Sequence, residues 1–117
     1  MTEHPIHRLD DDVHQRVRLG ILTVLAGVAR ADFGHLKSTL GVTDGNLGKH
    51  LEALAAAGYV QVDKVIDGRR TRTWARITRS GRTALRREVQ ALQDLLELLA
   101  TAGADQPVGR ESVERSG

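Results

Sequence analysis

The chain has 117 residues, which is enough for one domain with a single hydrophobic core. It contains no cysteine, which excludes disulfide bonds, thiolate metal sites and cysteine nucleophiles and fits a reducing compartment. No apolar run approaches the roughly 18 residues of a membrane span, and the polar start lacks a signal-peptide pattern, so we expect a soluble, cytoplasmic protein.

The small net charge of +2 hides an uneven distribution of charged residues. Residues 59–87 hold nine basic side chains against two acidic ones, whereas residues 88–117 hold six acidic side chains and two basic ones. A basic middle beside an acidic end favours a face that meets a polyanion. A run of arginines that only solvates the surface is the alternative.

The first predicted helix covers about residues 11–29. Its apolar side chains recur at spacings of three and four, which is typical of an amphipathic helix with one buried face. Asp10, Asp11 and Asp12 suit the start of this helix, where the dipole favours negative charge. Residues 1–9 show no such period, and we expect them to be flexible.

A helix-turn-helix pattern follows the first helix. Residues 34–40 predict a short helix, and Gly41 ends it. Thr43 or Asp44 then caps a second helix over residues 44–57. A short helix, a glycine-containing turn and a second helix together make a helix-turn-helix, although many helical proteins contain such corners.

A β-hairpin and a long helix complete the pattern. Residues 59–66 and 71–77 alternate with a period of two around an Asp-Gly turn, which predicts two paired strands. Thr78 caps a final helix from residue 79 to about 101. Residues 102–117 are rich in Gly, Ser and charge, and we expect a disordered tail.

The final helix carries an apolar stripe with coiled-coil spacing. Its members are spaced four, three, four and three residues apart, over about two heptads: Leu85, Val89, Leu92, Leu96 and Leu99. This stripe predicts a helix that pairs with a partner helix.

The second helix of the helix-turn-helix has an outward face that suits a DNA major groove. At 100° per residue, Leu47, Leu51 and Leu54 fall on one side and must pack on the core. The opposite side carries Gly45, Asn46 and Lys49, and slim side chains let a helix enter the groove. An asparagine can bond the adenine edge, and a lysine can reach guanine or phosphate.

These residues also have plainer interpretations. Asn46 and Lys49 can be ordinary solvated surface residues. His50, on the flank of the helix, can bond a phosphate, or it can be a boundary histidine that packs against the short helix before it.

Basic side chains gather on the predicted hairpin. Arg69 and Arg70 lie at its tip, Arg72 follows, and Lys64 lies on the opposing strand. Such side chains contact phosphates or enter a narrow minor groove. A hairpin that is merely soluble is the alternative.

The remaining titratable residues offer little chemistry. The five histidines, at positions 4, 7, 14, 35 and 50, match no compact metal-ligand spacing. No nucleophile–base pair, phosphate loop or carboxylate pair stands out. We therefore expect no enzyme activity, no metal and no cofactor.

Three stretches carry a resemblance to a known family. They read RLGILTVLAG in the first helix, DFGHLKSTLGVTDGNLGKHLEALAAAGYV across the helix-turn-helix, and GRRTRTWARITRSGRTAL across the hairpin and last helix. Over about residues 9–99 the chain resembles the bacterial winged helix transcriptional regulators related to the MarR and ArsR families, of the short stand-alone type.

The resemblance implies a homodimer whose recognition helices enter successive major grooves. It implies an inverted-repeat operator with half-sites about one helical turn apart. The family's DNA-contact role carries over to the start of the recognition helix, at Thr43, Asp44, Gly45, Asn46, Gly48, Lys49 and His50. Its wing contacts carry over to Arg69, Arg70 and Arg72. Pairing through the first and last helices adds Val13 and Val17 to the predicted dimer interface.

The chain departs from parts of this family. It lacks the cysteine pair of ArsR-type metal sensors. It is also shorter than full MarR proteins, with less helix to enclose a ligand pocket, so the resemblance carries no effector over to it.

The expected fold class is mostly α with a β-hairpin wing (α+β). It is a winged helix-turn-helix over residues 10–101 that ends in a long dimerisation helix. The expected function is sequence-specific binding of double-stranded DNA in transcription regulation. A winged helix that binds only other proteins is the alternative.

Overall fold

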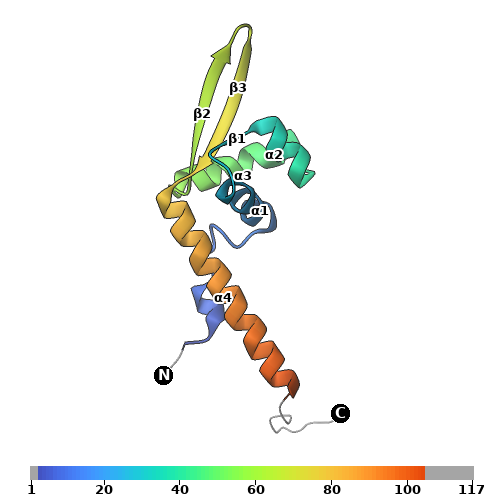
Figure 1. The fold of residues 1–117 in the computed structure, drawn as a ribbon, viewed down its shortest axis with the longest axis vertical. Coiled ribbons are helices and arrows are strands. Elements are labelled where there is room, and N and C mark those ends of the chain that lie inside the picture. The colour runs from blue at the N-terminus through green and yellow to red at the C-terminus, as the bar shows by residue number, and fades with distance from the viewer. Residues whose placement is uncertain (1–2, 105–117) are drawn as a thin grey trace.

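The computed structural model describes residues 3–104, and it confirms the predicted fold class. In chain order the elements are η1 (Pro5–Arg8), α1 (Arg16–Ala26), β1 (Ala31–Asp32), α2 (Phe33–Leu40), α3 (Asp44–Ala56), β2 (Val60–Asp67), β3 (Arg70–Ile77) and α4 (Arg79–Ala104). The molecule is elongated, 68 × 29 × 21 Å, because the wing leaves the helical body at one end and α4 leaves it at the other (Figure 1).

The three strands form one antiparallel sheet in the order β1-β3-β2. Strands β2 and β3 pair from Val60↔Ile77 at the base to Asp67↔Arg70 at the far end. Only Gly68 and Arg69 are left for the turn, and Gly68 adopts a φ of 65°, which glycine accepts without steric cost. The predicted hairpin is thus confirmed, and β1 adds a third strand only at its base.

The core lies where α1, α2, α3 and the base of the wing meet. Its largest fully buried apolar side chains are Val13, Ile21, Leu22, Leu25, Leu36, Leu47 and Leu54. Each such side chain stabilises the fold by about 1.5–3 kcal/mol when it is buried. The predicted inward face of α3 is confirmed, because Leu51 is buried as well.

Polar side chains begin the helices where the sequence predicts caps. The Asn46 backbone N–H donates to Thr43 Oγ1 at 3.2 Å, and the Gly81 N–H donates to Thr78 Oγ1 at 3.0 Å. Gly41 ends α2 in the left-handed conformation, at φ 64°. These local bonds satisfy backbone groups that a helix end leaves unpaired.

The start of the first helix differs from the prediction. Helix α1 begins at Arg16 rather than near residue 11, and it ends at Ala26 rather than near residue 29. Gln15 caps it, because its side-chain oxygen accepts from two backbone N–H groups at 3.0 Å. Asp10 does not cap α1, because it lies six residues before the first residue of that helix. Its carboxylate accepts hydrogen bonds from the Asp12 N–H and the Tyr59 hydroxyl.

The N-terminal segment holds a short helix, where the sequence shows no period. Pro5–Arg8 forms the 3-10 helix η1 beside α4, with Pro5 buried. Arg8 Nη2 lies 2.5 Å from Asp94 Oδ2, and this hydrogen bond holds the pKa of Asp94 below its usual range. This contact between distant parts of the chain leaves no periodic trace in the sequence.

The end of α4 also extends past the prediction, to Ala104. The rest of the predicted tail, residues 105–117, lies outside the described residues. No helix within residues 3–104 is both long and apolar enough to cross a membrane.

Candidate nucleic-acid interface

The start of α3 is an open surface. Thr43, Asp44, Gly45, Asn46 and Lys49 are exposed there, as the sequence predicts for the outward face. A Cβ atom added at Gly45 would meet no other atom within 4 Å, so the fold does not require a glycine at this position. The backbone in front of α3 is therefore accessible, and its first N–H groups and dipole favour an anion.

Asp44 brings a negative charge to this surface, and a lysine balances it. Lys37 Nζ on α2 lies 2.8 Å from Asp44 Oδ1, and both side chains are largely exposed. Periodicity in the sequence does not reveal this role of Lys37, because its nearness to Asp44 follows only from the angle between α2 and α3. The pair keeps the helix start close to neutral.

His50 lies inside the protein and not on the outward face. It is 6% exposed, and its Nδ1 accepts a hydrogen bond from Arg18 Nε at 3.1 Å. Burial lowers the pKa of His50, and the charges of Arg18 and Lys49 lower it further. Of the two interpretations, the structure favours the boundary histidine, although its partner is on α1 and not on α2. The neutral ring joins α3 to α1.

Replacing His50 with asparagine is expected to reduce the pH dependence of stability. In the unfolded chain His50 has its ordinary pKa of 6.5, and in the folded chain its pKa is lower. The contribution of neutral His50 to the stability of the fold is therefore fully present above about pH 6.5. That stability is lost as the pH falls, because the unfolded chain binds the proton more readily. Asparagine offers an acceptor oxygen to Arg18 but does not titrate.

Urea unfolding at pH 7.5 and 5.5 measures this effect. We expect His50→Asn to be about 1 kcal/mol less stable than the wild type at pH 7.5, because its packing is altered. Between pH 7.5 and 5.5, however, its free energy of unfolding should fall by less than that of the wild type. The control is His35→Asn, because His35 is exposed on α2. An equal pH slope in wild type and His50→Asn would contradict the prediction.

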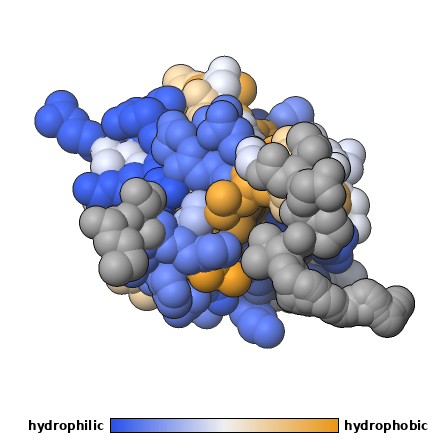
Figure 2. All heavy atoms as spheres, turned by 90° about the horizontal axis from the view of Figure 1, so that it is seen from below, coloured by the Kyte–Doolittle hydropathy of each residue, from blue (hydrophilic) through white to orange (hydrophobic). Residues whose placement is uncertain are grey.

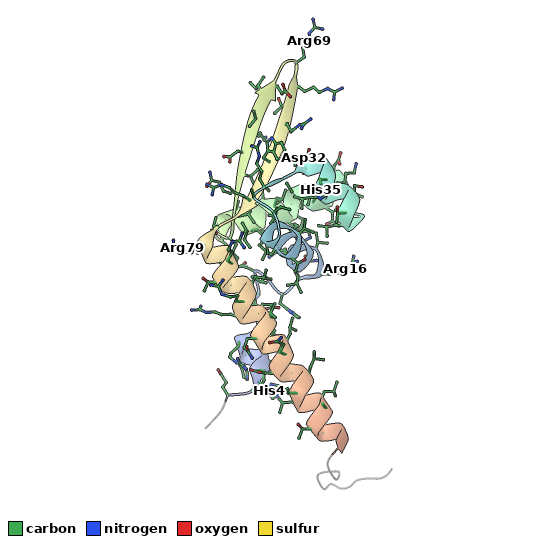
Figure 3. All side chains as sticks on the ribbon, viewed as in Figure 1. His4, Arg16, Asp32, His35, Arg69 and Arg79 are labelled. Atoms are coloured by element: carbon green, nitrogen blue, oxygen red, sulfur yellow. The ribbon has the colours of Figure 1, made fainter. Side chains whose placement is uncertain are left out.

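The four predicted basic residues of the wing lie in three different places. Strand pairing places Lys64 opposite Thr73, on the face of the wing that looks toward α3. Arg70 and Arg72 alternate with Thr73 and lie on the other face. Arg69 projects from the tip (Figure 3). The sequence alone does not show which face of the wing lies toward α3, because that depends on how the wing packs on the helices.

A stacked group at the base of the wing was not predicted. The Arg30 guanidinium lies 3.8 Å from the centre of the Trp74 ring, and that of Arg72 lies 5.7 Å from it. Arg72 Nη1 is also 3.8 Å from Asp32 Oδ2. Cation–π contacts of this kind stabilise by about 0.5–2 kcal/mol. Arg72 is thus partly engaged, whereas Arg69 and Arg70 form no ion pair within residues 3–104.

A hollow of about 320 Å³ separates α3 from the wing. Gly48 forms part of its α3 side, and Lys64 forms part of its wing side. A Cβ atom at Gly48 would meet nothing within 4 Å, so this glycine keeps the hollow wide and is not needed for packing.

The predicted dimer surface splits into exposed and buried parts. On α4, Val89, Leu96 and Leu99 are exposed, and Leu96 and Leu99 keep 65% and 70% of their surface. Leu85 and Leu92 are partly buried against the chain's own body. Seen from the α4 end of the molecule, hydrophobic side chains lie uncovered among hydrophilic ones (Figure 2).

Val13 and Val17 do not belong to this exposed surface. Both are buried in the core of the single chain. The sequence could not separate them from interface residues, because both kinds fall on apolar helical positions. We therefore leave them out of the proposed dimer contact.

The histidines do not form a metal site in the part of the chain described. His4 lies beside α4, and His35 lies on α2 near the wing (Figure 3). No group of three or more metal-ligating side chains of His, Cys, Asp or Glu occurs within residues 3–104.

Comparison with known proteins identifies the fold family. The model of a winged helix DNA-binding domain matches residues 17–96. The chain belongs to the winged helix DNA-binding domain family. The match begins in α1 and ends in α4, so this winged helix domain includes α3, the wing and the first leucines of the α4 stripe.

Two known proteins resemble this winged helix protein over most of its length. It is 37% identical over 79 residues to an uncharacterized protein of Methanocaldococcus jannaschii, over 68% of this chain and 86% of the relative. The structure of a transcriptional regulator homologue from Pyrococcus horikoshii OT3 matches with a TM-score of 0.76 and 30% identity. That match covers 84% of this chain and 98% of the other.

Two more distant structures share the winged helix fold. The transcriptional regulator MosR of M. tuberculosis, solved with DNA, has a TM-score of 0.63 at 20% identity, over 91% of this chain and 74% of MosR. A MarR family regulator from Silicibacter pomeroyi has a TM-score of 0.57 at 19% identity, over 86% and 78% of the two chains. These two structures show a shared fold, and the family match confirms the predicted resemblance to winged helix DNA-binding proteins.

Proposed function

We propose that this winged helix protein is a cytoplasmic transcriptional regulator that binds double-stranded DNA in a sequence-specific manner as a homodimer. One observation carries the proposal: the exposed, slim start of α3 and the basic tip of the wing belong to one DNA-binding domain, which spans residues 17–96. Helix α3 would enter the major groove, and the wing would lie on the backbone or in the minor groove.

The proposed DNA contacts omit one predicted residue. On α3 they are Thr43, Asp44, Gly45, Asn46, Gly48 and Lys49, and on the wing they are Lys64, Arg69, Arg70 and Arg72. His50 is left out, because its ring is buried against Arg18. Arg72 contributes less than Arg69 or Arg70, since Asp32 and Trp74 already engage it.

The proposed dimer forms through the exposed leucines of α4. Two subunits related by a two-fold axis would read an inverted repeat with half-sites about one helical turn apart. Leu96 and Leu99 belong to the last third of α4, the helix that leaves the body at the end opposite the wing (Figure 1). The pairing helices therefore leave α3 and the wing uncovered.

Salt-dependent binding tests the proposal. Duplexes selected from genomic DNA by the protein would be titrated by fluorescence anisotropy at several salt concentrations. We expect the logarithm of affinity to fall linearly with the logarithm of salt, with a slope near −0.9 per phosphate neutralised. A chain that binds no duplex at low salt would instead be a winged helix used for protein contact.

Replacing Arg70 with alanine is expected to weaken binding to all duplexes by a similar factor, about three- to tenfold. A phosphate contact carries no sequence information, so the salt slope should become shallower by about one. Asn46→Ala should instead change which operators are preferred, because a bidentate contact discriminates by about 1–3 kcal/mol.

The matched control for Arg70→Ala is Arg79→Ala. Arg79 lies at the start of α4, away from the wing tip, and its removal changes the net charge equally (Figure 3). An equal loss of affinity in both variants would show that only net charge matters, and the wing assignment would then be wrong.

Replacing Gly45 with leucine is expected to preserve the fold and to weaken DNA binding at least about tenfold. No atom lies near the added Cβ, and leucine favours a helix by close to 1 kcal/mol over glycine. The side chain would hold the groove away from the backbone of α3. Thermal unfolding and anisotropy measure the two effects, with Gly45→Ala as the small-residue control. A Gly45→Leu protein that unfolds at a lower temperature would count against this account.

A further inference from the structure

Glu88, in the middle of α4, is a fully buried ionisable residue. The other buried residues of this stretch of α4 are Ala84 and Ala91, which are small and apolar. The backbone N–H of Asp10 donates to Glu88 Oε1 at 3.0 Å, and His14 Nδ1 lies 2.5 Å from Oε2. A buried carboxylate costs several kcal/mol of desolvation, so a leucine would hold this part of the core together at less cost.

Glu88 is connected to the end of α3 by a series of hydrogen bonds that passes through Asp10 and Tyr59. Asp10 Oδ2 accepts a bond of 2.7 Å from the Tyr59 hydroxyl, and this bond, together with burial, raises the pKa of Tyr59 to about 12. The Tyr59 backbone N–H in turn donates to Leu54 O at 2.9 Å, in the last turn of α3. A continuous chain of polar contacts thus runs from α4 through Asp10 to the recognition helix.

A second attachment fixes the beginning of α4. The Thr78 N–H donates to Tyr59 O at 3.0 Å, and the Thr78 hydroxyl donates to Gly58 O at 2.7 Å. Thr78 and Glu88 are ten residues apart, which is about 15 Å along a helix. Arg82 and Asp94 also tie α4 to α1 and η1, whereas Thr78 and Glu88 connect it to Tyr59, directly and through Asp10. Two such points along one helix fix its direction relative to α3, which ends just before Tyr59.

We propose that Glu88 is a positioning residue that, through Asp10 and Tyr59, fixes the direction of α4 relative to α3. In the dimer this direction sets the separation of the two recognition helices and therefore the half-site spacing that the protein accepts. The inference rests on the proposed function, because it requires the α4-mediated dimer. It assigns to a buried residue, far from the DNA-contact surface, a part in operator selection.

Distances between the two recognition helices test the proposal directly. The chain has no cysteine, so Ala56→Cys, at the exposed end of α3, provides one spin label per subunit. Pulsed dipolar spectroscopy then gives the distribution of label distances in the dimer. We expect a narrow distribution in this parent and one about twice as broad after Glu88→Leu, because leucine keeps the volume but cannot accept from Asp10.

Two further variants separate positioning from stability. Glu88→Gln retains an acceptor for the Asp10 N–H and should keep the narrow distribution, even if its unfolding temperature changes. Tyr59→Phe removes only the hydroxyl that bonds Asp10, and it should broaden the distribution although the carboxylate stays. If Glu88→Leu does not fold, the label-distance distribution of Tyr59→Phe still tests the proposal.

Operators with altered spacing provide the functional readout. The preference of the parent for its selected spacing, over one that is two base pairs longer, should fall about threefold or more in Glu88→Leu and Tyr59→Phe. Unchanged label distances and unchanged spacing preference in both folded variants would overturn the inference. A parent without inter-subunit coupling would remove the dimer and this inference with it. A dimer that binds no duplex would refute the proposed function and the part of Glu88 in operator selection, whereas the label distances would still decide whether Glu88 fixes the direction of α4.

Discussion

Replacing Gly81 with alanine is expected to destabilise the fold by about 3 kcal/mol, the upper part of the usual range for overpacking. A Cβ atom at this position would overlap the backbone oxygen of Tyr59 and lie 2.9 Å from Ile77 Cγ1. The overlapping atom belongs to the backbone, so no side-chain rotation can relieve the contact. Helix α4 would have to move away from the base of the wing.

Urea unfolding at neutral pH measures this loss, and another glycine offers a matched control. Gly48→Ala makes the same chemical change inside α3, where the new methyl group meets nothing within 4 Å. Alanine favours a helix by about 1 kcal/mol over glycine, so this variant should be slightly more stable than the wild type. If both variants lost the same stability, the close approach of α4 to Tyr59 would not explain the result.

Replacing both Leu96 and Leu99 with aspartate is expected to yield a folded monomer that binds an operator at least about 100-fold more weakly. Both side chains are mostly exposed in the single chain, so the core does not need them. Charges in the apolar contact would oppose pairing of the helices. Two half-sites bound by separate subunits lose the avidity of a linked dimer, which contributes about 10²–10⁴.

Multi-angle light scattering gives the mass of this variant, and anisotropy gives its affinity. Thr101→Asp is the control, since Thr101 is exposed near the same end of α4 but falls on the opposite side from the leucine stripe. It should remain dimeric and retain its affinity. A double variant that stays dimeric would exclude this end of α4 from the interface.

The parts of the fold that short-range chemistry determines were predictable. Thr43 and Thr78 cap helices because a hydroxyl near a helix start finds free N–H groups in almost any context. The Asp-Gly turn and the alternation beside it predict the paired strands of the wing, since both signals lie within a few residues of each other. The inward leucines of α3 follow from helical periodicity alone.

The parts that depend on distant residues were not predictable from one sequence. Asp10 looks like a helix-capping acid until Tyr59 and Glu88 are brought beside it, 49 and 78 positions along the chain. His50 looks like a possible phosphate contact until Arg18 on another helix donates to its ring. Periodicity reports that a face is buried or exposed, but it does not report which partner lies there.

The outer half of the wing stands free of the third strand, because β1 pairs with β3 only at Ala31↔Ala75 and Asp32↔Trp74. Beyond that point β2 and β3 support only each other, and a two-stranded ribbon is marginally stable in water. We therefore expect backbone amides near Ile66 to exchange with solvent much faster than those of α3. DNA that holds the ribbon in one shape would remove conformational entropy, which opposes binding by about 1 kcal/mol or more for each residue ordered. In the proposed complex, the same freedom would let one wing follow grooves of different width.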